Sequence, residues 1–446
     1  MRPHSPTSQD KQERQRALLA KLEGRLFRAS QLEKPTTAPQ GPAIAQLIPG
    51  LEPHETPSGA VWKLALRVSL DGRPTRQGVR FPYGEEARAL RPDLVAELAG
   101  DEEFRGLPLE AVAFLDAETT GLSGGTGTYV FLVGLGHFQG EDFVVEQYFM
   151  RDYDQEAPLV EALRRRMADF EAIVSYNGKA FDVPLLRTRF VLHRAPSAWE
   201  KPHLDLLGLA RRLWRKRLAD CSLPTVERDI LGVRRVSDVN GAMVPRIYFD
   251  FVRGVRVERM IPVFDHHAQD IVSLASLLGR LGRMIESPSH PDFAYPSDQM
   301  GLAKLFEQSG KSDCAMACLE EALHRLRDPL MIHQVSMRLA GFYKRRSQWE
   351  EASAIWEAQI KSGPPGQVEP YVELAKYYEH RAKDYARALR LVKEAIRALE
   401  FREEMESSLS PSDPFSETVT GMDDLLHRLQ RLEARQERHE AKARPV

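Results

Sequence analysis

The stretch that decides the fold is Phe114-Leu115-Asp116-Ala117-Glu118-Thr119-Thr120-Gly121-Leu122. The apolar run Ala111 to Leu115 predicts a short buried strand that ends on two carboxylates. Side chains at positions i and i+2 of a strand lie on the same face, so Asp116 and Glu118 point the same way and repel each other unless a cation lies between them. Hard oxygen ligands of this kind favour Mg²⁺ or Mn²⁺. The alternative is a strand followed by a polar turn, with both acids merely solvated.

Composition describes an ordinary globular protein. The chain has 446 residues, 42% apolar and 28% charged, which predicts about two to four domains. Lys and Arg number 62 against 64 for Asp and Glu, so net charge excludes a general polyanion binder and any nucleic-acid surface must be a local patch. The three cysteines form neither a metal-ligand spacing nor an even disulfide framework. With no apolar stretch near the ~20 residues of a membrane helix, we expect a cytoplasmic protein without membrane contact.

The two segments that precede the acidic strand contain no recognisable catalytic motif. Residues 1–40 are expected to form a mobile N-terminal arm with one helical piece, Arg16 to Phe27. Residues 41–107 are expected to be an accessory segment, a flap packed on the α/β domain after it, with an alternating run Val61 to Leu70 and a helical run Glu85 to Leu98.

Residues 108–285 have an α/β pattern. Two β-rich runs, Thr128 to Phe138 and Phe143 to Met150, are joined by a hairpin turn. Helices and strands then alternate: helix Glu156 to Phe170, strand Ala172 to Tyr176, helix Phe181 to His193, and a short strand ending at Asp205. This order predicts a mixed sheet with helices on both faces and a site at the carboxyl ends of its strands.

The glycine-rich loop Ser123 to Thr128 is not a nucleotide P-loop. It lacks the G-K-[ST] ending and joins strand to strand rather than strand to helix. We expect a flexible rim beside the acidic pair.

Two further polar groups come later in the chain. Asp182 begins a predicted helix, and it is either a capping acid or a third metal ligand, with Asn177 and Phe181 lining a groove for a base or sugar. His266 and Asp270 are four residues apart and share a helix face, either as surface groups of a capped helix or as site residues.

Together these motifs resemble the DEDD superfamily of 3′–5′ exonucleases, which have the ribonuclease-H fold. Asp116 to Leu122 resembles the first motif, and His266 to Asp270 the third. Asn177 to Asp182 resembles the second, N-x-x-x-F-D, in the form found in proofreading exonucleases of family B polymerases. The Tyr176-Asn177-Gly178 and His203-to-Leu207 segments and the C-terminal repeats resemble the bacterial YprB-type exonucleases more narrowly.

The resemblance implies hydrolysis of phosphodiester bonds, in single-stranded DNA or RNA, by a two-metal-ion mechanism that releases nucleoside monophosphates. Two Mg²⁺ or Mn²⁺ ions would be bridged by Asp116, with Glu118 and Asp270 completing the first site and Asp182 serving the second. His266 would accept the proton of the attacking water. Substrate contacts are expected from four residues: Thr119, Gly121, Asn177 and Phe181.

The base assignment departs from the family pattern. The histidine branch of the superfamily has its His five residues before the last Asp, where this chain has Asp265. His266 stands four before, where the tyrosine branch has its Tyr, and His267 three before. Spacing favours His266, and His267 stays open as the alternative.

A predicted helix, Asp205 to Leu218, is crowded with cations: Arg211, Arg212, Arg215, Lys216 and Arg217. They form either a solvated basic face or a phosphate-binding patch beside the site.

The C-terminal part is helical and repetitive. After a proline-marked linker, residues 286–298, small and large apolar residues recur with a period of about 35 over residues 299–400, which resembles tetratricopeptide repeats. Such an array binds a protein partner or braces the nuclease. Residues 401–446 predict a linker, a capping helix containing Leu425 and Leu432, and a charged tail.

We therefore expect a metal-dependent 3′–5′ exonuclease domain followed by a helical repeat domain. The rivals are a non-catalytic repeat scaffold with a vestigial nuclease fold and a ribonuclease-H-like endonuclease. The sequence does not decide whether the substrate is DNA or RNA. It also leaves open the biological pathway, the protein partner and the oligomeric state.

Overall fold

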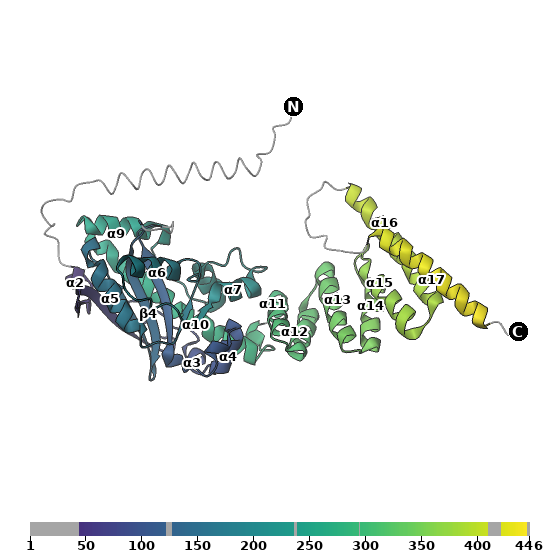
Figure 1. Ribbon diagram of the computed structural model, residues 1–446, viewed down its shortest axis with the longest axis horizontal. Coiled ribbons are helices and arrows are strands. Elements are labelled where there is room, and N and C mark those ends of the chain that lie inside the picture. Colours follow the sequence, from purple (N-terminus) through teal and green to yellow (C-terminus); the bar gives the residue numbers. More distant parts are fainter. Residues whose placement is uncertain (1–43, 122–126, 236–238, 294, 409–420, 444–446) are drawn as a thin grey trace, which may run out of the picture.

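A seven-stranded mixed sheet forms the centre of the N-terminal half (Figure 1). The computed structural model describes residues 44–121, 127–235, 239–293, 295–408 and 421–443. The predictions for residues 1–40 and for most of the loop Ser123 to Thr128 lie outside these ranges. The strands are β1 (Glu52–Thr56), β2 (Gly59–Ser69), β3 (Val112–Thr119), β4 (Val130–Gln139), β5 (Asp142–Phe149), β6 (Ala172–Ser175) and β7 (His203–Asp205).

The strand order is β1-β2-β5-β4-β3-β6-β7. Strands β3, β4 and β5 form the predicted antiparallel meander, and the β4–β5 hairpin turns at Gly140 with a φ of 60°. Strands β6 and β7 are parallel to β3. The mixed sheet expected from the sequence is confirmed, with helices covering both faces.

The accessory segment differs from the expected flap. Strand β2 pairs with β5 from Trp62 opposite Phe149 to Ser69 opposite Asp142, so β1 and β2 extend the sheet itself. The predicted helix Glu85 to Leu98 is two helices, α3 (Gly84–Arg88) and α4 (Pro92–Ala99). The break falls at Arg91, whose ψ of 135° is extended because a following proline disfavours the helical conformation.

The sheet is buried on both faces. Along β3, Val112 and Phe114 belong to one apolar core and Ala113 and Leu115 to the other, as a two-residue side-chain period requires. Asp116 and Glu118 continue the face of Phe114. The remaining helices of this half are α2 (Ile44–Leu47), α5 (Glu156–Met167), α6 (Asp182–Leu192), α7 (Leu206–Trp214), α8 (Leu223–Val226), α9 (Val244–Val252) and α10 (Ile261–Glu286).

Helix α10 lies unusually close to the sheet because β4 has glycines beneath it. A Cβ on Gly134 would lie 2.0 Å from Ile271 Cδ1 and 2.6 Å from His267 Cε1. A Cβ on Gly136 would lie 2.5 Å from Ile271 Cγ2. Gly134 is the register partner of Asp116, so the close approach brings α10 beside the acidic strand.

The C-terminal helices continue outward from the sheet as a row (Figure 1). They are α11 (Pro296–Gln308), α12 (Ser312–Arg325), α13 (Pro329–Arg345), α14 (Trp349–Ser362), α15 (Glu369–Tyr377), α16 (Tyr385–Ser408) and α17 (Met422–Ala443). Each helix packs on the next. Fully buried alanines lie where paired helices touch: Ala303, Ala315, Ala340, Ala352, Ala375 and Ala388. The helical region is therefore confirmed, and its tetratricopeptide character stays a prediction.

The first helices of this C-terminal row pack directly on the sheet half and are not merely connected to it by a linker. A single apolar core runs from the sheet through α7 and α10 into α11, α12 and α13. A Cβ on Gly301 of α11 would lie 2.8 Å from Leu213 Cα of α7, so the two helices are in backbone contact. No helix in the described part of the chain combines the length and the apolar character needed to cross a membrane.

Candidate active site

Strand β3 presents the first two acids from its interior rather than from its end. The strand extends through Asp116 and Glu118 to Thr119, beyond the predicted end at Leu115, with a register irregularity between Glu118 and Thr119. Both acids are half-buried. Asp116 Oδ2 lies 3.7 Å from His267 Nε2 of α10, and Glu118 clusters with His266 and Asp270 of the same helix. The strand pairs with β4 along this stretch, so the backbone that carries the two carboxylates is held on a rigid element.

The third acid, Asp182, is buried at the first position of α6. The loop before it is tightly bent: Asn177 has a φ of 65°, and a Cβ on Gly178 would lie 2.3 Å from Ser175 Oγ and 3.2 Å from Asp182 Oδ2. Asp205 fixes this loop by accepting hydrogen bonds from the backbone N–H groups of Asn177 at 2.8 Å and Lys179 at 3.1 Å. The second motif is thus shaped by β7, which the sequence placed nearby without a role.

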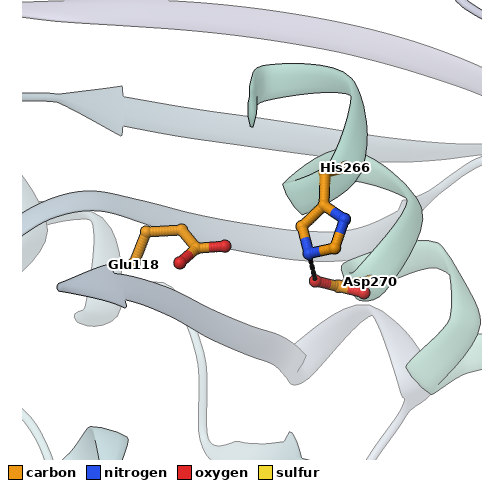
Figure 2. A group of neighbouring side chains, drawn as sticks. All are labelled: Glu118, His266 and Asp270. Carbon is orange, nitrogen blue, oxygen red and sulfur yellow. Dashed lines mark ion pairs between the residues drawn. The ribbon is translucent and has the colours of Figure 1, made fainter. Parts of the chain in front are cut away.

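Helix α10 brings the third motif to the acidic strand. His266 Nε2 lies 3.3 Å from Asp270 Oδ2, as their four-residue spacing predicted. One ligand atom each from Glu118, His266 and Asp270 lie within 4.8 Å of one another. Figure 2 shows the Glu118 carboxylate directed from the strand toward His266 and Asp270 on the helix. Residues far apart in the sequence therefore form one cluster.

Several buried carboxylates lie close together here, and their negative charges repel one another. Burial raises the pKa of Asp116 well above its usual value, and the charges of Asp270, Asp182 and Glu118 raise it further. Burial, then Asp270 and Asp182, raise the pKa of Glu118 to about 8. Burial raises the pKa of Asp182 to about 7. Carboxylates that suppress each other's ionisation in this way are stabilised by a hard cation, so the donor set fits Mg²⁺ or Mn²⁺.

Arg235 is the functional group that the sequence did not reveal. Its guanidinium donates to Glu227 Oε2 at 2.8 Å and Oε1 at 2.6 Å, contacts Asp270 Oδ1, and donates to His266 Nδ1 at 2.7 Å. Glu227 lies in the π-helical turn η4 (Glu227–Leu231) that follows α8. Local spacing carries no sign of this contact, because Arg235 and Asp270 are brought together only by the fold.

The two histidines have different roles in the structure. His267 is fully buried, and its Nδ1 accepts from Gln147 Nε2 at 2.9 Å, an amide that also donates to the Phe264 carbonyl at 2.9 Å. Its Nε2–H therefore donates to the Asp116 carbonyl at 3.2 Å. Burial lowers the pKa of His267 to about 4. His267 is thus a neutral tie between α10 and the acidic strand.

His266 faces the site. Its Nδ1 accepts from Arg235 and its Nε2 points at Asp270, so both ring nitrogens are engaged within the cluster. The choice of His266 over His267 as the general base stays a prediction. A proton can reach its Nδ1 only after the Arg235 contact opens.

A pocket of about 350 Å³ opens beside the cluster. It is lined by Asp116, Tyr176, Leu223, Pro224, Val239, Asn240, Gly241, His266 and Asp270. The four residues expected to contact substrate do not line it. Thr119 is buried and donates to the Gly121 carbonyl at 2.7 Å, which shapes the turn after β3, and Asn177 is exposed while Phe181 is half-buried. Sequence reasoning missed the wall supplied by Leu223, Pro224, Val239, Asn240 and Gly241.

A ribonuclease H superfamily model matches residues 113–282. The protein of Bacillus subtilis (strain 168) named "Uncharacterized protein YprB" is 35% identical over 288 residues, which cover 64% of this chain and 68% of the relative. The chain belongs to the YprB family. These findings agree with the nuclease-like ribonuclease H fold described above.

Among solved structures, the chain is similar to the family B DNA polymerase of the hyperthermophilic archaeon Pyrobaculum calidifontis, with a TM-score of 0.31 and 15% identity. The similarity covers 53% of this chain and 30% of the polymerase. A likeness at this level carries no argument about activity.

Proposed function

We propose that this YprB-family protein is a metal-dependent 3′–5′ exonuclease that hydrolyses single-stranded nucleic acid. The observation that carries the proposal is the convergence of Glu118, His266 and Asp270 within 4.8 Å, with Asp182 close enough to raise the pKa values of Glu118 and Asp116. A purely structural cluster would pair each of these carboxylates with a cationic side chain. Among the described residues, Arg235 pairs with Asp270, whereas Asp116 Oδ2 faces the neutral His267 at 3.7 Å.

Divalent cations are the cofactors that the site fits. Asp116, Glu118, Asp182 and Asp270 would hold them. Bound ions would lower the pKa of an attacking water and stabilise the charge that develops on the leaving 3′-oxygen.

The side chains of this protein supply the remaining steps. The pocket takes the terminal nucleotide, with Leu223 and Pro224 as an apolar wall for the base or sugar and Tyr176 at its edge. His266 accepts a proton at Nδ1 once Arg235 withdraws from it. His267 keeps the Asp116 backbone and α10 in register while this happens.

The scaffold alternative draws on one observation, the ion pair between Arg235 and Asp270. In that ion pair, the Arg235 guanidinium already neutralises Asp270, a carboxylate that the metal site would need as a ligand. A vestigial site would keep Arg235 in place and bind no divalent ion.

The test is a nuclease assay with purified full-length protein and Mn²⁺. Single-stranded DNA and RNA, each labelled at the 5′ end, are incubated side by side. We expect a ladder that shortens from the 3′ end and releases mononucleotides. Circular single strands serve as the control, because an exonuclease leaves them intact and an endonuclease cuts them. No cleavage of any substrate, together with no Mn²⁺ binding by calorimetry, would support the scaffold instead.

A further inference from the structure

We propose that α7 and the first helices of the helical row form one basic track that binds the phosphate backbone of the substrate strand on the 5′ side of the pocket. This inference rests on the proposed function. It assigns to the docked helices a role in holding nucleic acid, in addition to any role in holding a protein partner.

The track begins at the exposed face of α7. The helix buries an apolar stripe that includes Leu209, Leu213 and Trp214 and leaves Arg211 and Arg212 exposed. Arg215 and Lys216, directly after the helix, are exposed as well. Within the described ranges, Arg211, Arg215 and Lys216 form no salt bridge. The cations are therefore available to a ligand.

The near end of the track reaches the pocket. Tyr176 lines the pocket, and its hydroxyl donates to the Cys221 carbonyl at 2.6 Å, beside the end of α7. The Cys221 thiol in turn lies 3.9 Å from the carbonyl of Ala210 in α7, the residue directly before Arg211. A strand leaving the pocket past Tyr176 thus meets Arg211 first.

The far end of the track crosses onto the helical row. Helix α11 is in backbone contact with α7 at Gly301, and Arg212 Nη1 donates to Gln308 Oε1 at 3.0 Å. Lys304 of α11 is exposed and lies among cations. Arg338 of α13 pairs with Glu307 of α11. Partial burial lowers the pKa of the Lys304 amine, and the charges of Lys216, Arg338 and Arg215 lower it in addition. Cations from the end of α7 and from α11 and α13 therefore gather at one seam.

The charge of Glu307 opposes the cations around Lys304. Glu307 of α11 is shared by Arg338 at 2.6 Å and Arg345 at 3.1 Å, so one carboxylate faces two guanidinium groups. Like charges held together on a folded surface repel each other, and a polyanion relieves that repulsion. A flexible single strand, with its regular phosphates, is the ligand that fits a row of cations leading from a nuclease pocket.

Arg217 is excluded from the track, although the sequence grouped it with its neighbours. It pairs with the buried Asp298 and lies over the Tyr295 ring, 3.8 Å from the centroid. Arg217 therefore clamps α11 onto α7, and this clamp sets the distance between the two halves of the track.

The test compares two triple variants of the full chain. R215A/K216A/K304A removes three cations of the seam, and K361A/R390A/R397A removes three exposed cations of α14 and α16 as the matched control. Binding of fluorescein-labelled dT30 and rU30 is measured by anisotropy in EDTA, so that no cleavage occurs, at several salt concentrations. Single-strand binding weakens with salt with a slope of about −0.7 per phosphate contact, so the seam variant should lose about two units of slope.

The seam variant should also bind the 30-mers at least about tenfold more weakly at low salt, and the control variant should match the wild type. Cleavage of a tetranucleotide in Mn²⁺ should stay within about twofold for all three proteins, because the pocket is unchanged. If the seam variant keeps the wild-type slope and affinity, the track is wrong while the proposed function stands. A wild type that neither binds nor cuts any strand overturns the proposed function itself. K216Q/K304Q, which keeps side-chain bulk, repeats the comparison if the alanine variant melts early.

Discussion

Arg235 offers the sharpest test of how the acidic cluster is stabilised. Its guanidinium is 10% exposed, and its partners Glu227 and Asp270 are 2% and 11% exposed, so the ion pairs are shielded from solvent. Removing one member of such a group leaves uncompensated buried charge and costs about 3–5 kcal/mol. We therefore expect Arg235→Ala to lower the free energy of unfolding by about that amount in EDTA.

The matched control is Arg228→Ala, seven residues earlier in the chain. Arg228 pairs with Asp229, and their side chains are 56% and 36% exposed, so the loss should be at most about 1 kcal/mol. Urea denaturation of both variants gives the comparison. Mn²⁺ at a hundred times its Kd should restore about 2.7 kcal/mol to Arg235→Ala, because Asp270 is then free to hold the ion. If the two variants lose equal stability, the buried ion pairs of Arg235 contribute no more than an exposed pair, and the reasoning is wrong.

Three other predictions concern the site and its support. His266→Ala should lower turnover by about 10²-fold while the Mn²⁺ affinity measured by calorimetry stays nearly unchanged; turnover at the wild-type rate would move the general-base role to another group. The pKa values of Glu118, about 8, and Asp182, about 7, lie above their unfolded values, so the folded state binds protons more tightly. Metal-free protein should therefore gain thermal stability from pH 8.5 to pH 6, and Mn²⁺ should flatten this dependence; a gain with rising pH would contradict it. Gly134→Ala should cost about 1–3 kcal/mol, since the new methyl group overlaps α10, whereas Gly208→Ala on the open face of α7 should be neutral or stabilising in the same melt.

Local patterns were sufficient for the framework of the fold. The strand before Asp116, the β4–β5 hairpin and the spacing of His266 and Asp270 depend on side-chain periods of two and of about four residues, which any short window shows. That the three acidic motifs belong to one site was implied by their joint resemblance to the DEDD exonucleases, not by these side-chain periods. Strand β2 was found as an alternating run, but its partner could not be, because pairing with β5 bridges about eighty residues of chain.

The features that the sequence could not supply depend on contacts between distant segments. Arg235 reaches Asp270 only because the segment after η4 lies against α10, and Arg212 reaches Gln308 only because Gly301 lets α11 approach α7. The role of His267 likewise depends on burial beneath Gln147, which spacing alone cannot show. The first array helices share a core with the sheet half, which favours a bracing role there over a freely jointed module.

The most direct test of the central claim is the activity of Asp116→Asn. The amide keeps the size and the backbone contacts of Asp116 but removes the negative charge that a divalent cation needs. With Mn²⁺ and a 5′-labelled single strand, the wild type should shorten the substrate from its 3′ end, and Asp116→Asn should leave it intact while melting at or above the wild-type temperature. Degradation by Asp116→Asn at the wild-type rate would contradict the assignment of this cluster as the active site.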